Sequence, residues 1–107
     1  MVVKPVFVLV KFPAGAPLER AVLADLLQRT SVRYQTIPGL RRKLFIGGEG
    51  VGGGWYEWAS RQQAEAYFND GWRSTMLANY GVAPTVEYFD APCIVDNDRG
   101  VIDYFLD

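Results

Sequence analysis

The sequence contains no histidine and only one cysteine. Without histidine, a Ser-His-Asp triad, a Cys-His pair, a haem held by a proximal histidine and histidine-bearing zinc or iron sites are all excluded. One cysteine cannot close an intrachain disulfide or form a thiolate cluster. Cys93 lies in the apolar residues 91–95, where we interpret it as a small buried hydrophobe. We therefore expect no cofactor and no metal.

The chain also lacks an excess of charge and a long apolar run. Its 11 basic and 12 acidic residues leave a net charge of −1, so the basic surface of a nucleic-acid-binding protein is missing. The apolar residues 1–12 are too few to span a membrane and are not followed by a signal-peptide pattern. With 107 residues we expect one domain, 1–107, in the cytoplasm, with neither nucleic acid nor membrane as partner.

Apolar periodicity and turn residues predict the element order β-α-β-β-α-β. The predicted helices begin at Pro17 and at Ser60, which starts a Ser-x-x-Gln capping box; they end before Ile37 and at Gly81. Residues 69–71 interrupt the second helix. The predicted strands cover residues 2–12, 40–46, 55–59 and 85–90, with the last resuming at residues 94–95 and a short extended piece at 101–106.

A glycine cluster at residues 47–54 is predicted to form a hairpin-type loop between neighbouring strands, either a plain long hairpin or a loop over a pocket mouth. It contains the spacing G-x-G-x-x-G, but a dinucleotide fingerprint opens a helix, and this one opens a strand. Nucleotide binding is therefore not expected.

The predicted order is that of a ferredoxin-like α+β domain. Its two helices cover one face of the sheet. The first strand is apolar on both faces, with Val6, Val8 and Val10 on one and Phe7 and Leu9 on the other. A second apolar face must also be buried, so we expect a homodimer through sheet-to-sheet packing, giving a dimeric α/β barrel.

More than half of the aromatic residues lie between Trp55 and Phe89. They either fill the core or line a pocket for a small molecule, because Trp and Tyr combine large apolar rings with polar tips. On the third predicted strand, Tyr56 and Trp58 point to one face, while Trp55 and Glu57 point to the other. The candidate substrate-binding residues are Trp55, Tyr56, Trp58, Trp72 and Tyr80.

The only basic run is Arg41-Arg42-Lys43. Strand alternation predicts that Arg42 shares a face with Leu40 and Leu44, with Arg41 and Lys43 opposite. These charges are either solvated, engaged in dimer salt bridges, or used to hold an anionic substrate or developing phenolate.

Four segments resemble the YdhR-like monooxygenase family: residues 37–43, 53–61, 80–92 and 95–97. This family is part of the dimeric α+β barrel superfamily, so the resemblance implies two ferredoxin-like units that pack their sheets into a barrel. It also implies monooxygenase activity. The catalytic Asn, Trp, Tyr and Arg set of cofactor-free relatives does not align with this sequence, and none of its positions is transferred.

The leading hypothesis is a cofactor-independent monooxygenase acting on a small electron-rich aromatic or phenolic compound. In it Arg42 stabilises the substrate anion, and Glu57 and Tyr34 are the candidate bases. One alternative is a non-catalytic small-molecule-binding or stress-response barrel. Another is a muconolactone-type isomerase, which would work without oxygen.

Overall fold

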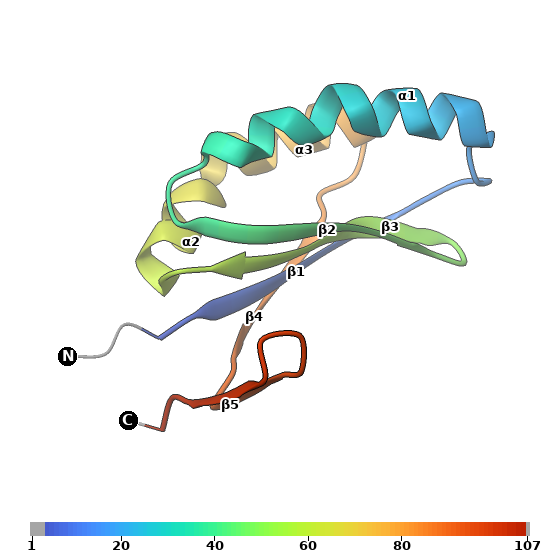
Figure 1. Cartoon of the computed structure of the whole chain (residues 1–107). Coiled ribbons are helices and arrows are strands. Elements are labelled where there is room, and N and C mark those ends of the chain that lie inside the picture. The colour runs from blue at the N-terminus through green and yellow to red at the C-terminus, as the bar shows by residue number, and fades with distance from the viewer. Residues whose placement is uncertain (1–3, 107) are drawn as a thin grey trace.

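A four-stranded antiparallel sheet, covered by helices on one face, forms the body of the molecule (Figure 1). This computed structural model describes residues 4–106, so the expected start of the first strand at Val2 lies outside the described residues. The strands are β1 (Val6–Pro13), β2 (Leu40–Gly48), β3 (Val51–Trp58) and β4 (Thr85–Asp90). Their order, β2-β3-β1-β4, confirms the ferredoxin-like α+β prediction.

The first helical region comprises α1 (Arg20–Ser31) and the 3₁₀ helix η1 (Val32–Thr36), and it stops before Ile37 as predicted. Its start differs from the expectation at Pro17. Glu19, the residue before α1, has extended backbone angles (φ −56°, ψ 144°), and its side chain caps nothing within the described structure. Pro17 and Leu18 therefore belong to the connection from β1.

The second helical region is divided into α2 (Arg61–Tyr67) and α3 (Asp70–Tyr80), and each helix has its own cap. The Gln63 N–H donates to Ser60 Oγ at 3.2 Å, and the Trp72 N–H donates to Asn69 Oδ1 at 2.9 Å. Gly81 ends α3 in the left-handed conformation, with φ 75°. The predicted capping box, interruption and stop are confirmed.

The glycine cluster joins neighbouring antiparallel strands in a hairpin, as predicted, but most of it lies within the strands and not in a long loop. Only Glu49 and Gly50 join β2 to β3. Gly53, with φ 158°, packs against β1 so closely that a Cβ atom there would collide with the carbonyl oxygen of Val10. The glycines permit this close approach of neighbouring strands.

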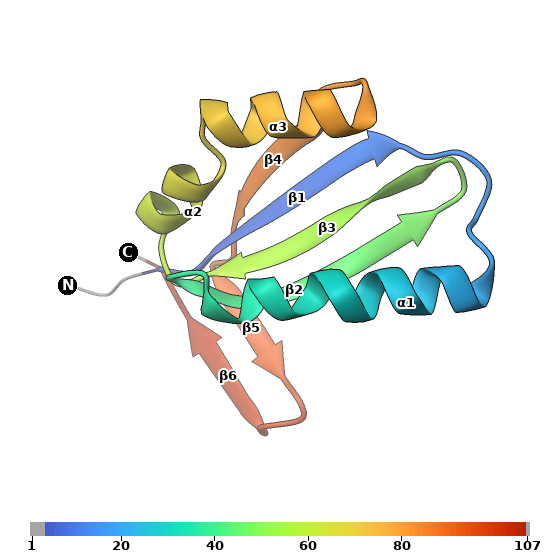
Figure 2. The same ribbon diagram turned by 90° about the horizontal axis from the view of Figure 1, so that it is seen from above.

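The C-terminal segment forms a separate hairpin of β5 (Cys93–Asp96) and β6 (Val101–Tyr104), which projects from the sheet (Figure 2). The prediction that residues 94–95 resume β4 is therefore wrong. The Asp96 carboxylate stabilises the turn by accepting hydrogen bonds from the N–H groups of Asp98 and Arg99. Cys93 is exposed on this hairpin rather than buried.

The core lies between the sheet and the α2–α3 region. Its buried members come from β1, β3 and α2 with its C-cap: Val6, Val8, Val10, Tyr56, Trp58, Ala64 and Phe68. By contrast, α1 lies entirely within the described residues and has no buried side chain. Leu18, Val22 and Leu26, which recur at helical spacing, are exposed. The α2–α3 region therefore packs onto the core, whereas α1 adds no buried side chain to it.

Substitution of Gly53 by alanine is expected to cost about 3 kcal/mol of unfolding free energy or to prevent folding, because the new methyl group meets strand backbone. Gly50→Ala is the matched control: its φ is also positive, at 71°, but no atom lies within 4 Å of its Cβ position. That change should cost about 1 kcal/mol. Urea denaturation measures both, and equal losses would contradict the close-approach argument.

Candidate active site

The two faces of the sheet separate the residues that the sequence singled out. Val8 is paired with Tyr56, and both are buried under the helices on what we call the inner face. Trp58 shares this face. Trp55 alternates to the opposite, outer face, where its ring stacks with Phe7 and Phe89 at centroid distances of 5.8 and 6.1 Å. Trp55 is therefore not brought together with the inner aromatic residues.

A register shift between Leu40 and Arg42 decides which cation reaches the inner face. Leu40 is opposite Trp58, whereas Arg42 is opposite Glu57 and Lys43 is opposite Tyr56. Arg41 is thus an extra residue in β2, and the prediction that Arg42 and Leu40 share a face is wrong. Arg42 and Glu57 lie on the outer face, and Lys43 is the basic residue that turns inward.

Lys43 lies among aromatic rings beneath η1. Its Nζ atom is 3.5 Å from the ring centroid of Tyr34, 4.0 Å from that of Phe45 and 4.8 Å from that of Tyr56. Tyr34 and Phe45 pack edge to face, with their ring centroids 5.5 Å apart. Ring faces attract an ammonium ion, so the aromatic residues hold the Lys43 side chain over them.

The phenol of Tyr34 has a lowered pKa. Burial alone raises its pKa, but the hydrogen bond and charge of Lys43, helped by the charge of Arg33, outweigh burial and lower the pKa below the usual 10.0. Burial also lowers the pKa of Lys43. A phenol and an amine that each lose a proton more readily than usual thus lie in contact.

The pKa values of two nearby tyrosines, Tyr56 and Tyr67, are shifted in the opposite direction. Burial raises the pKa of Tyr67 to about 12, and it raises that of Tyr56 still more. An ionised Tyr34 raises both further, because a second phenolate beside it is repelled. Tyr56 and Tyr67 therefore remain protonated donors when Tyr34 is ionised.

A cluster of rings continues from Tyr56 towards α3. Phe68 meets Tyr56 and Trp72 edge-on at centroid distances of 5.0 and 4.9 Å, and Trp58 lies 5.4 Å from Tyr67. The buried Nε1–H of Trp58 has no hydrogen-bond acceptor within the described structure. Tyr80 is separate from this cluster, because it is exposed and stacks on Phe12 at 4.7 Å.

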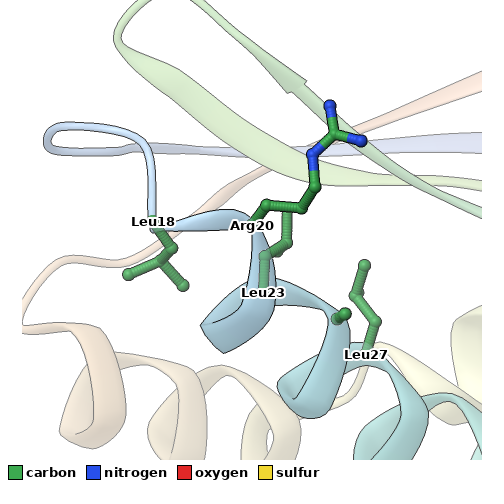
Figure 3. Close-up of a pocket in the computed structure, with 5 residues that line it drawn as sticks. Leu18, Arg20, Leu23 and Leu27 are labelled. Carbon is green, nitrogen blue, oxygen red and sulfur yellow. The ribbon is translucent and has the colours of Figure 1, made fainter.

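An open groove of about 450 Å³ runs along α1. It is lined by Leu18, Arg20, Leu23, Ala24 and Leu27. Figure 3 shows Leu18 on the connection before the helix and Arg20, Leu23 and Leu27 on α1, with the Arg20 guanidinium group directed towards the sheet. The groove is open to solvent, and every residue that lines it belongs to α1 or to the connection before it. Beyond Leu27 the chain continues through η1, where Tyr34 lies on Lys43.

Among residues 4–106, no group of three or more His, Cys, Asp or Glu side chains is placed to hold a metal ion. In the same part of the chain, no helix has the length and apolar character needed to cross a membrane.

Two solved structures are similar to this chain. A protein of unknown function from Nitrosomonas europaea has a TM-score of 0.60 and 19% identity, over 85% of this chain and 92% of that one. A monooxygenase from the gene ActVA-Orf6 of Streptomyces coelicolor, in complex with the ligand nanaomycin D, has a TM-score of 0.59 and 18% identity. That match covers 87% of this chain and 91% of the monooxygenase. No family model and no curated protein matches the sequence. The likeness shows a shared α+β fold.

Sequence reasoning selected Tyr34, Tyr56, Trp58 and Trp72, and the structure brings these four to the inner side. It missed Lys43 and the contribution of Phe45, because strict alternation along β2 placed Lys43 on the wrong side relative to Leu40. The available signal was the basic run 41–43, because one extra residue within it changes which cation faces the helices.

Tyr34 is expected to be the first of these inner-face tyrosines to ionise as pH rises. Its pKa is lowered, so its phenolate forms below pH 10, whereas Tyr56 and Tyr67 ionise only above it. Absorbance of tyrosinate during an alkaline titration measures this order. Tyr34→Phe should remove the early phase, and Lys43→Met should move it to higher pH. An early phase that survives in Tyr34→Phe would contradict the assignment.

Proposed function

We propose that the protein is a monooxygenase that oxidises a small electron-rich aromatic or phenolic compound with dioxygen and without a metal or flavin. The observation that carries the proposal is the contact of Tyr34 with Lys43 beneath η1. The shared fold with a monooxygenase that binds an organic ligand supports it, as do the resemblance of the sequence to YdhR-like monooxygenases and the groove along α1.

The reaction needs a base, a bound aromatic ring and an environment that excludes water. The Tyr34 phenolate accepts the proton of the substrate hydroxyl, and the ammonium group of Lys43 stabilises the resulting substrate phenolate. The substrate anion gives one electron to dioxygen, and the radical pair combines at a ring carbon to form a peroxide anion. Tyr34 returns the proton to this anion, which gives a hydroperoxide. Loss of water from it leaves a quinone, so phenol and dioxygen give quinone and water.

The inner aromatic residues border the proposed site on the side of the core. The proposal assigns the half-buried Trp72 to substrate positioning, and it assigns the buried Tyr56 and Trp58 to its support from behind. The proposal places Tyr80 as a substrate-binding residue at the C-terminal end of α3, beside Phe12. Arg42, Glu57 and Trp55 have no part in this reaction scheme, since they lie on the outer face.

We also propose that the outer face is buried in a homodimer by sheet-to-sheet packing. This face carries half-buried or exposed apolar side chains from all four strands, among them Phe7, Leu9, Leu44, Ile46, Trp55 and Phe89. The radius of gyration, 15.4 Å, exceeds the roughly 13 Å of a compact chain of this length. A second copy would cover both the face and the projecting β5–β6 hairpin.

Purified protein is expected to consume dioxygen with a hydroquinone, anthrone or catechol after treatment with a chelator and without added flavin. Tyr34→Phe should lower kcat about 10²- to 10⁴-fold because the base is lost. Trp72→Phe should lower it less, and Tyr104→Phe, on the β6 hairpin, should not change it. An oxygen electrode and mass spectrometry of the product measure this.

Two outcomes would contradict the proposed monooxygenase activity. Ligand binding without any product would indicate a binding protein, and product formation in the absence of oxygen would indicate an isomerase.

Sedimentation at micromolar concentration is expected to give a dimer. Leu44→Glu should shift it to a monomer, because Leu44 is exposed on the outer face and a carboxylate there cannot enter an apolar interface. Leu77→Glu, on the exposed part of α3, is the matched control and should remain dimeric. A wild-type monomer at this concentration would refute the proposed interface.

A further inference from the structure

Gly54 lies in the interior of the sheet, on its inner face. Its strand, β3, runs between β1 and β2, and Gly54 is opposite Val10 on one side and Phe45 on the other (Figure 2). Because Val10 is buried under the helices, a side chain at position 54 would point to the same face. Glycine weakens the interior of a strand, so its presence at this buried position indicates that neighbouring groups need the space.

The space above Gly54 is filled by the side chains of Lys43 and Tyr56. A Cβ atom at position 54 would lie 2.8 Å from Cε1 and 3.3 Å from Cζ of the Tyr56 ring, and 3.0 Å from Cε of Lys43. Each of these distances is shorter than the usual contact between carbon atoms. The φ angle of Gly54 is not positive, so space and not backbone conformation is the reason for a glycine here.

Of these two side chains, that of Lys43 is the one that can move away. The Tyr56 ring is 3% exposed and packs edge-on against Phe68 at 5.0 Å. The Lys43 chain reaches diagonally from β2 over Gly54, and its Cε atom carries the Nζ atom that lies 3.5 Å from the ring centroid of Tyr34. A methyl group at position 54 would therefore push the ammonium group off this ring.

We propose that Gly54 is a positioning residue for the pair formed by Lys43 and Tyr34, because the absence of a side chain there lets the Lys43 chain lie over β3 and brings its ammonium group onto the Tyr34 ring. The inference rests on the proposed function for its catalytic meaning. The register shift in β2 turns Lys43 to the inner face, and Gly54 then sets how far across the sheet its chain extends. The contact needs both features.

Gly54→Ala tests the proposal through the pH titration of Tyr34. The charged and titratable groups that face Tyr34 come from four elements: Lys43 of β2, Arg33 of η1, Tyr56 of β3 and Tyr67 of α2. Subtracting the tyrosinate absorbance of each protein's Tyr34→Phe counterpart isolates the Tyr34 phase. We expect Gly54→Ala to move this phase up by about half a pH unit or more, because a withdrawn cation stabilises the phenolate less.

Gly52→Ala is the matched control. It adds the same methyl group to the same face of β3, but there the nearest atoms belong to the ring of Phe12 and to Ala14. The Tyr34 phase of this variant should therefore coincide with that of the wild-type protein.

Two double variants separate the charge of Lys43 from the fit of its chain. In a Lys43→Met background, Gly54→Ala should leave the Tyr34 phase in place, since methionine has a side chain of similar length without the charge. Gly54→Ala is also combined with Tyr56→Leu, which removes the ring atoms nearest to the new methyl group and so relieves the closest collision. Relative to Tyr56→Leu alone, the Tyr34 phase should again lie at higher pH.

An unchanged Tyr34 phase in folded Gly54→Ala would overturn the proposal, and so would an equal shift in Gly52→Ala or in the Lys43→Met background. If Gly54→Ala does not fold, an unchanged phase in the comparison with Tyr56→Leu overturns it instead. These titrations need no substrate. A shifted phase in a protein without oxygen uptake would refute the monooxygenase alone, whereas oxygen uptake with an unshifted phase would refute the role of Gly54 alone.

Discussion

The contact between the Lys43 ammonium group and the ring of Tyr34 connects the fold to its proposed chemistry. It exists because β2 contains an extra residue beside Trp58, which turns Lys43 towards the helices. An ordinary strand would present Arg42 there. The same contact lowers the pKa of the phenol and holds a positive charge where the reaction scheme needs it. One irregularity in the sheet therefore determines which side chains can act together.

The strands and the helix ends were predictable from the sequence, because both depend on local signals that tertiary structure did not override. These signals are the apolar residues of β1 and the residues Ser60, Asn69 and Gly81 at the helix ends. The site was predictable only in part. Tyr56 and Trp58 follow simple alternation, but a bulge leaves no mark in the hydrophobic pattern, so Lys43 was missed. The start of α1 and the separation of β5 from β4 were also missed, because both depend on how the chain leaves the sheet.

Two apolar surfaces of different kinds remain on the protein. The outer face of the sheet is broad and gathers residues from all four strands, which suits a second copy of the chain. The groove beside α1 is open, and three leucines, Ala24 and Arg20 line it. The proposed subunit contact and this groove lie on opposite sides of one sheet.

The division of the helical layer has a consequence for how such a protein could change over time. Trp58, Phe68 and the valines of β1 hold the fold together, whereas α1 adds no buried side chain to that core. Replacing Leu23 or Leu27 alters the wall of the groove at little expense in stability. The surface beside α1 can therefore change by single substitutions that leave folding intact. The core and this surface are carried by different segments, and selection can act on each independently.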